Sequence, residues 1–358
     1  MREREGGVGC HRASGAEAFF ELAWEGGCRA LAALGVMPGR LYDIGGFRVR
    51  MRAGGPMVGH LLGAFGHLEI SPAESRDLDI LAWDSVSSGV PMPSPPWGRD
   101  DYGQRGEIRG FNDARFMAAF DQVGGALNLL DRASGRAIFW TRDGARLPEH
   151  ERGAPFRAIL NGWLGGRGCA LAHGAAVGAG GGAVLLAGMG GSGKSTTALI
   201  CVGGGMSFLG DDYCLLRADP SPEVSSVYGT AKVAPADLAR MPGLAGRAAV
   251  DPGVPGKALI FLADALPGCF ARRLPLRAVL RPVVAGGRET SLRAADAAEA
   301  LRALAPSSIF QVSGSGGGTF DLLAGLVRAL PCYHLALGTD FSRIGEVVRG
   351  VLSGVSGR

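Results

Sequence analysis

Apolar positions in the first part of the chain predict one helix and several short strands. From Ala16 to Leu34 they recur at helical spacing, whereas Phe47, Val49 and Met51 alternate with arginines, as is typical of a half-buried strand. Strands are predicted at residues 41–51, 78–83, 127–131 and 137–141, the last two as a hairpin. We therefore expect a small α+β sheet domain over residues 16–147, preceded by a flexible polar tail over residues 1–15.

The pattern changes at a predicted helix over residues 147–164, beyond which strands and helices alternate. The predicted strands are 169–177, 183–187, 207–210, 258–263, 276–284 and 333–337. The predicted helices are 194–202, one that opens at Asp296 with Glu299 as a capping box, 320–330 and 340–352. Such alternation is typical of an α/β fold. We expect a second domain over residues 148–352, followed by a short tail over residues 353–358.

Composition excludes several classes of protein. With 47% hydrophobic and 20% charged residues, the chain can bury a core, and its net charge of +4 is too small to indicate nucleic-acid binding. Residues 168–193 contain no Asp, Glu, Lys or Arg, but ten of them are glycines and His173 interrupts the stretch, so no membrane span is expected. No apolar run follows the N-terminus, so no signal peptide is expected. The seven cysteines form no CxxC pair, which predicts free thiols in a cytoplasmic protein.

The strongest motif is Gly188-Met-Gly-Gly-Ser-Gly-Lys194-Ser195, which fits the pattern G-x-x-x-x-G-K-[ST]. In such loops the backbone N–H groups cradle phosphates, the lysine reaches the β- and γ-phosphates, and the serine ligates magnesium. The motif follows a predicted strand and opens a predicted helix, whose N-terminus favours an anion. The residues expected to hold ATP are Gly188, Gly190, Gly191, Ser192, Gly193, Lys194, Ser195 and Thr196. The alternative is a chance match in a chain with 60 glycines.

Two adjacent carboxylates, Asp211 and Asp212, end a short predicted strand 17 residues after Lys194. If that strand neighbours the strand before the loop, one carboxylate can hold the magnesium water shell while the other accepts a proton from an attacking hydroxyl. Adjacent carboxylates also shift each other's pKa, which suits one of them to act as a base. The alternative is an inert surface turn.

Three further residues are candidates for the same site. His173 lies in an apolar strand that is predicted to form a hairpin with the strand before the loop, although a lone histidine there can also be a core residue. Lys232 and Lys257 are, with Lys194, the only lysines among 37 basic residues, and each lies shortly after a glycine and before an apolar run. A lysine beside a transferring phosphoryl group would offset its charge. The alternative is that both are solvated surface lysines.

In this order and spacing, the motifs resemble the catalytic domain of HPr kinase/phosphorylase and of bacterial HPr-kinase-like serine kinases. The segments that carry the resemblance are 172–177, 191–199, 209–213, 226–232, 306–311 and 330–335. It covers about residues 145–352 and implies an α/β P-loop domain related to ATP-dependent phosphoenolpyruvate carboxykinase. There are two departures: Thr196 stands where those kinases have glutamate, and their Arg-Gly phosphorylase segment has no counterpart.

The resemblance implies a role for each residue and a function for the chain. Asp211 would act as the acid/base on the acceptor hydroxyl, Asp212 would support the metal, and His173 would tune the pair. The expected activity is Mg²⁺-dependent transfer of the γ-phosphoryl group of ATP to a serine-type hydroxyl of a protein, peptide or small molecule. A precursor peptide of a natural-product pathway is one candidate acceptor, and GTP stays open as the donor.

The resemblance also implies a homo-oligomer. Two rival functions remain. One is a nucleotide-switched P-loop ATPase that acts as a binding or regulatory protein, and the other is a carboxykinase. The carboxykinase is disfavoured because a lysine, histidine and aspartate metal site after the loop is not evident.

Overall fold

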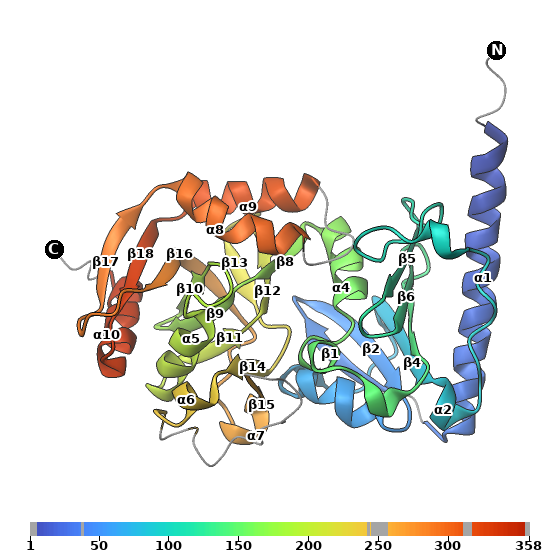
Figure 1. Cartoon of the computed structure of the whole chain (residues 1–358), viewed down its shortest axis with the longest axis horizontal. Helices are drawn as coiled ribbons and strands as arrows, with labels where there is room; N and C mark the ends of the chain where they lie inside the picture. The colour runs from blue at the N-terminus through green and yellow to red at the C-terminus, as the bar shows by residue number, and fades with distance from the viewer. Residues whose placement is uncertain (1–5, 37–38, 242–243, 245–256, 311–316, 355–358) are drawn as a thin grey trace. The chain divides into compact units, whose positions relative to one another are not determined.

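The chain divides into two compact units, and both contain helices packed on sheets of mixed parallel and antiparallel strands (Figure 1). The computed structural model describes residues 6–36, 39–241, 244, 257–310 and 317–354. The first unit consists mainly of Met1–Gly63 and Glu69–Trp163. The second consists of Ala64–Leu68, Leu164–Gln311 and Ser315–Arg358. A mixed α/β architecture, as the sequence predicts, is therefore present.

In the described part of the first unit, seven strands form one sheet in the order β3-β1-β2-β4-β7-β6-β5. The strands are β1 (Arg40–Ile44), β2 (Phe47–Ala53), β3 (Glu69–Ile70), β4 (Leu78–Asp84), β5 (Phe116–Asp121), β6 (Ala126–Asp131) and β7 (Arg136–Thr141). The β6–β7 hairpin is confirmed. The single strand predicted over 41–51 is instead the β1–β2 hairpin, because Gly45 and Gly46 have φ angles of 63° and 90°, as a tight two-residue turn requires.

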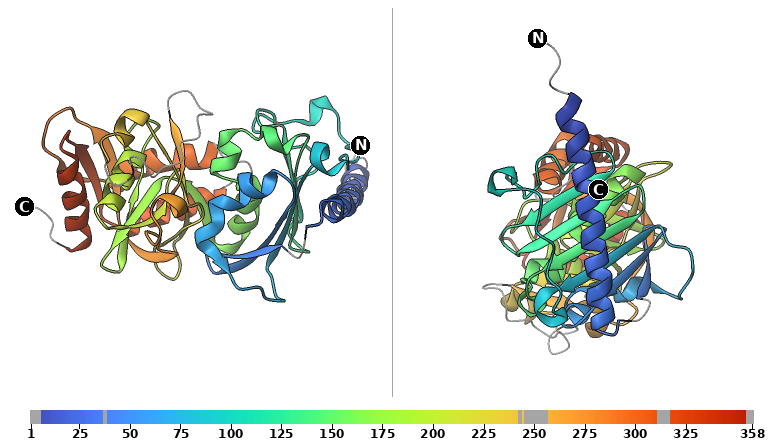
Figure 2. Two further views of the ribbon diagram at one scale, coloured as in Figure 1. Left: turned by 90° about the horizontal axis from the view of Figure 1, so that it is seen from below. Right: turned by 90° about the vertical axis from the view of Figure 1, so that its right-hand side faces the viewer.

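Helix α1 (Gly6–Ala33) lies along one face of this sheet (Figure 2). Phe19, Phe20 and Ala23 are buried with Trp83 and Ile138 of the sheet. The predicted tail over residues 1–15 is corrected in part, because α1 already begins at Gly6. A helix extends readily once one packed part of it has formed.

The predicted helix over 147–164 is broken in two. The shorter helices of the first unit are α2 (Ser85–Ser88), α3 (Glu149–Gly153) and α4 (Arg157–Leu164). The break lies at Ala154, whose φ of −143° and ψ of 68° are not helical. The physical reason is Pro155, since the ring of a proline disfavours the α conformation at the residue before it.

A buried charge lies in the middle of the same sheet. Asp79 on β4 is 1% exposed and pairs with Arg50, Arg52 and Arg76, of which Arg52 and Arg76 approach to 2.9 and 3.1 Å. We expect Asp79→Asn to lower the free energy of unfolding by about 2 kcal/mol, because it removes the charge that three guanidinium groups bind. Urea denaturation followed by tryptophan fluorescence measures this, since all five tryptophans lie between residues 24 and 163. The exposed control Asp100→Asn should stay within ~0.5 kcal/mol, and equal stability of both variants would contradict the expectation.

The described strands of the second unit form a large sheet in the order β11-β9-β10-β16-β13-β12-β8, with β18 beside β16 and β17 beside β18. Its strands are β8 (Cys169–His173), β9 (Ala175–Ala179), β10 (Gly182–Leu186), β11 (Ser207–Gly210), β12 (Tyr213–Arg217), β13 (Glu223–Ser225), β16 (Arg273–Val284), β17 (Ser291–Ala295) and β18 (Cys332–Leu337). β14 (Thr230–Val233) and β15 (Ala258–Phe261) form a separate ladder. β10 runs parallel to β16, and β16 runs parallel to β18.

Helices cover both faces of this sheet. They are α5 (Lys194–Gly203), α6 (Pro235–Leu238), α7 (Leu262–Ala265), α8 (Ala297–Phe310), α9 (Gly317–Ala329) and α10 (Phe341–Leu352). Side chains of a strand alternate between faces, so Val184 of β10 packs in one core with α5 and α10, while Leu185 packs in another with α8 and α9. The capping box at Asp296 and Glu299 is confirmed by reciprocal hydrogen bonds of 2.6 and 3.2 Å.

Two predictions about the strands near the motif are wrong. The predicted strand over 169–177 is divided at Gly174, so β8 pairs with β12 while β9 pairs with β10 and β11. His173 therefore ends β8 and does not belong to the hairpin with β10. β11, which leads to the two aspartates, borders β9 and not β10. The break is bridged by a hydrogen bond of 3.1 Å from Gly174 N–H to the Asp212 carbonyl oxygen.

No helix in the described ranges combines the length and the apolar character that a bilayer crossing needs. Six cysteines have described side chains, and all six are free thiols.

Candidate functional site

The glycine-rich segment 188–195 lies between β10 and α5, the position that the sequence predicts. Gly191 and Gly193 have φ angles of 80° and 97°, a region that favours glycine. A Cβ atom at Gly193 would also lie 2.4 Å from Leu337 Cδ1, which is closer than real contacts allow. The segment therefore depends on glycine to pass tightly from the strand into the N-terminus of α5, where a helix favours an anion.

Two polar groups of this loop are suited to phosphate. Lys194 Nζ is buried and donates hydrogen bonds of 2.8 and 3.1 Å to the carbonyl oxygens of Gly188 and Met189. Burial lowers the pKa of Lys194, and the charges of Asp211 and Asp212 oppose that shift. Ser192 Oγ is buried and has no hydrogen-bond partner within the described ranges. A phosphate oxygen would satisfy both side chains, so the loop fits a nucleotide phosphate.

Asp211 is a buried carboxylate that holds the start of α5. Its Oδ1 accepts a hydrogen bond of 2.8 Å from Ser195 Oγ, and its Oδ2 accepts one of 3.0 Å from the backbone N–H of Lys232. Burial, with the charge of Asp212, raises the pKa of Asp211 to about 6. Because Asp211 orients the Ser195 hydroxyl, it is suited to support a metal ion that this hydroxyl would ligate.

Asp212 occupies a different position, although it is the next residue. Its φ of 63° is left-handed, a sparsely populated conformation for a non-glycine residue that clusters at functional sites. Its Oδ2 lies 3.1 Å from Lys232 Nζ, and its Oδ1 lies 3.9 Å from His173 Nε2. Burial acts to raise the pKa of Asp212, but Lys232 and His173 hold it below its usual range. Asp212 is therefore an ionised carboxylate that faces the cavity.

His173 lies beside Asp212 at the end of β8. Its backbone N–H donates a hydrogen bond of 2.9 Å to Ser308 Oγ on α8. Its Nδ1 atom is buried and lacks a hydrogen-bond partner among the described residues. Burial, together with the charge of Lys194, lowers the pKa of His173 to about 4. The ring is consequently neutral near pH 7 and adds no positive charge, and its Nε2 atom, 3.9 Å from Asp212 Oδ1, is beyond hydrogen-bond distance of that carboxylate.

A cavity of about 350 Å³ joins most of the predicted site residues. Those that line it are His173, Gly190, Gly191, Ser192, Gly193, Lys194, Ser195, Thr196, Asp212, Lys232 and Lys257. Lys257 is exposed, whereas Lys232 is half-buried and paired with Asp212. The volume lies in the range of small-ligand sites. Gly188 and Asp211 are not among the lining residues and support the site from behind.

The sequence did not reveal two other polar residues of this cavity, Asp237 and Arg240. Asp237 on α6 accepts a hydrogen bond of 2.9 Å from Thr196 Oγ1. Arg240 lies 3.8 Å from the ring centroid of Phe341, and its guanidinium donates a hydrogen bond of 2.8 Å to the Thr339 carbonyl oxygen. Neither Asp237 nor Arg240 belongs to a recognisable sequence motif. No signal in the sequence connects these two residues with the loop.

Comparisons with known proteins assign neither a family nor a function to the chain. No protein-family model matches the chain, and no curated protein sequence matches it. Among solved structures, the chain is similar to the HPr(Ser) kinase/phosphatase from Coxiella burnetii, with a TM-score of 0.30 and 11% sequence identity. The similar region covers 51% of this chain and 88% of that one. Similarity at this level shows neither a shared family nor a shared function, so the function depends on the residues of the site.

Proposed function

We propose that the second unit is a phosphotransferase that binds MgATP at segment 188–195 and transfers the γ-phosphoryl group to a hydroxyl acceptor. The observation that carries the proposal is a continuous contact chain at the cavity: Ser195 to Asp211, Asp211 to the Lys232 backbone, and the Lys232 side chain to Asp212. It brings together a hydroxyl that can ligate a metal, a lysine ammonium and an ionised carboxylate within one site. Magnesium, held by Ser195 and supported by Asp211, would neutralise charge on the phosphates.

The geometry favours an exchange of the two aspartate roles that the resemblance implies. Asp211 is occupied by Ser195 and a backbone N–H, which suits support of the metal. Asp212 is ionised and lines the cavity, where it can take the proton from an acceptor hydroxyl as the oxygen bonds to phosphorus. The bond from the γ-phosphorus to the β,γ-bridging oxygen breaks, and ADP leaves with that oxygen. His173 would position Asp212 from the side opposite Lys232.

The proposal is tested by incubating the full chain with Mg²⁺ and γ-labelled ATP, together with a lysate of the native host or with candidate serine-containing peptides. The expected result is label on an acceptor, lost in the Asp212→Asn variant. Label that appears only as free phosphate would overturn the transferase and favour the nucleotide-switched ATPase. Failure to bind nucleotide at all would overturn both.

Lys232 gives a further prediction at this site. We expect Lys232→Arg to slow phosphoryl transfer by ~10²-fold, because Nζ lies against Asp212 and a planar guanidinium requires a different geometry from a slim ammonium. Lys257→Arg should have a smaller effect in the same direction, because that side chain is exposed at the edge of the cavity. Initial rates at saturating ATP measure both. An unchanged rate for Lys232→Arg would show that its charge, but not its shape, is what matters.

A further inference from the structure

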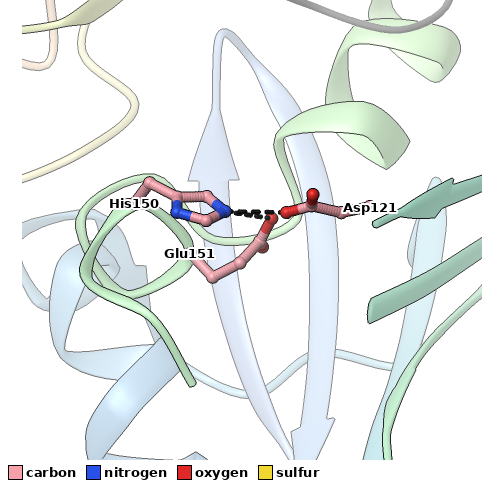
Figure 3. Close-up of side chains that lie close together, drawn as sticks. All are labelled: Asp121, His150 and Glu151. Carbon is pink, nitrogen blue, oxygen red and sulfur yellow. Dashed lines mark hydrogen bonds and ion pairs between the residues drawn. The ribbon is translucent and has the colours of Figure 1, made fainter. Parts of the chain in front are cut away.

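A separate cluster of metal-ligating side chains lies in the first unit. Asp121, at the end of β5, and His150 and Glu151, on α3, point toward one another (Figure 3). His150 Nε2 lies 2.7 Å from Asp121 Oδ2 and 3.9 Å from Glu151 Oε1. One ligand atom from each residue lies within 4.8 Å of the other two. An imidazole nitrogen and two carboxylate oxygens are thus gathered around one point.

Glu151 is the buried member of the cluster. Its side chain is only 6% exposed and is aimed at the other two residues (Figure 3). Its close polar neighbours are His150 and a second carboxylate, Asp121. The positive charge of Arg157 also acts on Glu151 and favours its ionised form. Glu151 is shielded from water, whereas Asp121 is 22% exposed. Two carboxylates this close repel each other unless a proton, a neighbouring cation or a metal ion offsets their charges.

The surroundings leave room beside the ligand atoms and orient one of them. The backbone N–H of Val123 donates a hydrogen bond of 2.9 Å to Asp121 Oδ1, so that Oδ2 is the oxygen that faces the cluster. A Cβ atom at Gly124 would lie 2.6 Å from Asp121 Oδ2 and 3.3 Å from His150 Nε2. The absence of a side chain at Gly124 therefore keeps the space next to two ligand atoms open.

We propose that Asp121, His150 and Glu151 bind one divalent transition-metal ion, for which Zn²⁺ is the best fit. Zn²⁺ takes histidine nitrogen and carboxylate oxygen at about 2.0–2.2 Å, and the three ligand atoms need only small side-chain rotations to surround it. An imidazole ligand favours Zn²⁺ over Mg²⁺ or Ca²⁺, which prefer oxygen alone. His150 is 32% exposed, so a water molecule can complete a tetrahedral shell.

The ion would join two parts of the first unit that lie far apart in the sequence. Asp121 belongs to β5, the edge strand of the sheet, whereas His150 and Glu151 belong to α3. Because Zn²⁺ takes its ligand atoms without their protons, any proton held between the three side chains leaves when the ion binds. A bound ion would therefore fasten α3 to the sheet edge and stabilise the folded unit, because an ion that binds only the folded state shifts unfolding to higher temperature.

The test is a titration of the full chain, stripped of metal with a chelator, with Zn²⁺ in the absence of nucleotide. Calorimetry should show one equivalent bound, and Co²⁺ in place of Zn²⁺ should give the visible absorption of a tetrahedral site. Zn²⁺ should raise the melting temperature followed by tryptophan fluorescence, which reports on residues 24–163. The Glu151→Gln and His150→Gln variants should lose affinity by more than the ~10–100-fold that removal of an outer-shell group costs.

Two further variants keep the result decisive. His334→Gln is the matched control, because it removes a histidine that lies 3.1 Å from Glu299 in a pair without a third metal ligand among the described residues, and it should keep full Zn²⁺ affinity. Gly124→Ala removes no ligand but fills the space beside the cluster, so it should weaken binding even if the ligand variants fail to fold. No stoichiometric binding by the unsubstituted chain, or equal affinity in Gly124→Ala and the unsubstituted chain, would overturn the proposal.

Discussion

Replacing Lys194 with alanine is expected to abolish turnover of MgATP and to weaken nucleotide binding while the fold survives. Lys194 is the cation inside the loop, and its Nζ already bonds two loop carbonyl oxygens. The β- and γ-phosphates would lose their mobile positive charge, and removal of one such electrostatic donor costs ~10²–10³-fold in turnover. Calorimetric titration with ATP and initial rates of phosphate transfer measure the two effects separately.

The fold should survive because burial already disfavours the charged form of Lys194, as its lowered pKa shows. Arg328→Ala, an exposed cation in the last turn of α9, is the control and should leave both measurements unchanged. ATP affinity and turnover in Lys194→Ala equal to those of the control would show that segment 188–195 is not a phosphate loop.

Asp212→Asn is expected to remove most of the turnover and leave the affinity for MgATP nearly intact. Asp212 lines the cavity as an ionised carboxylate, and loss of a general base costs ~10²–10⁴-fold. Asparagine tolerates the left-handed backbone that Asp212 adopts, so the loop conformation should persist. Single-turnover rates at saturating MgATP measure the effect.

Asp211→Asn is the matched variant, and it should weaken binding of MgATP through Ser195. The opposite pair of results, with turnover lost only in Asp211→Asn at unchanged affinity, would restore the roles that the family resemblance implies.

Elements with local signals could be predicted from the sequence. The capping box at Asp296, the periodic helix α10 and the β6–β7 hairpin all depend on residues close together in the chain. The errors at 41–51 and 169–177 both lie where the apolar pattern continues through glycines. At Gly45 and Gly46 the chain turns tightly into the β1–β2 hairpin, whereas the break at Gly174 is decided by the pairing of β8 with the more distant β12.

In the site, too, features encoded by consecutive residues could be predicted, whereas contacts between residues far apart in the sequence could not. The loop before Lys194 is encoded by consecutive residues, so its place between strand and helix could be predicted. The bond from Ser195 to Asp211 depends on β11 reaching the loop past β9, which no local pattern states. The contact of Asp237 with Thr196 likewise comes from the fold alone. The catalytic roles themselves stay predictions until the variants are measured.

The hydrogen bond between Gly174 and Asp212 ties together two breaks in the chain, one between β8 and β9 and the other between β11 and β12. Successive strand residues face opposite sides, so inserting one residue at either break would turn the following side chains to the wrong face. A Cβ atom at Gly174 would also lie 2.9 Å from the Leu186 carbonyl oxygen, just before the loop. Among relatives of this chain, the two breaks should therefore vary in length only together, so an insertion at one should accompany a compensating change at the other.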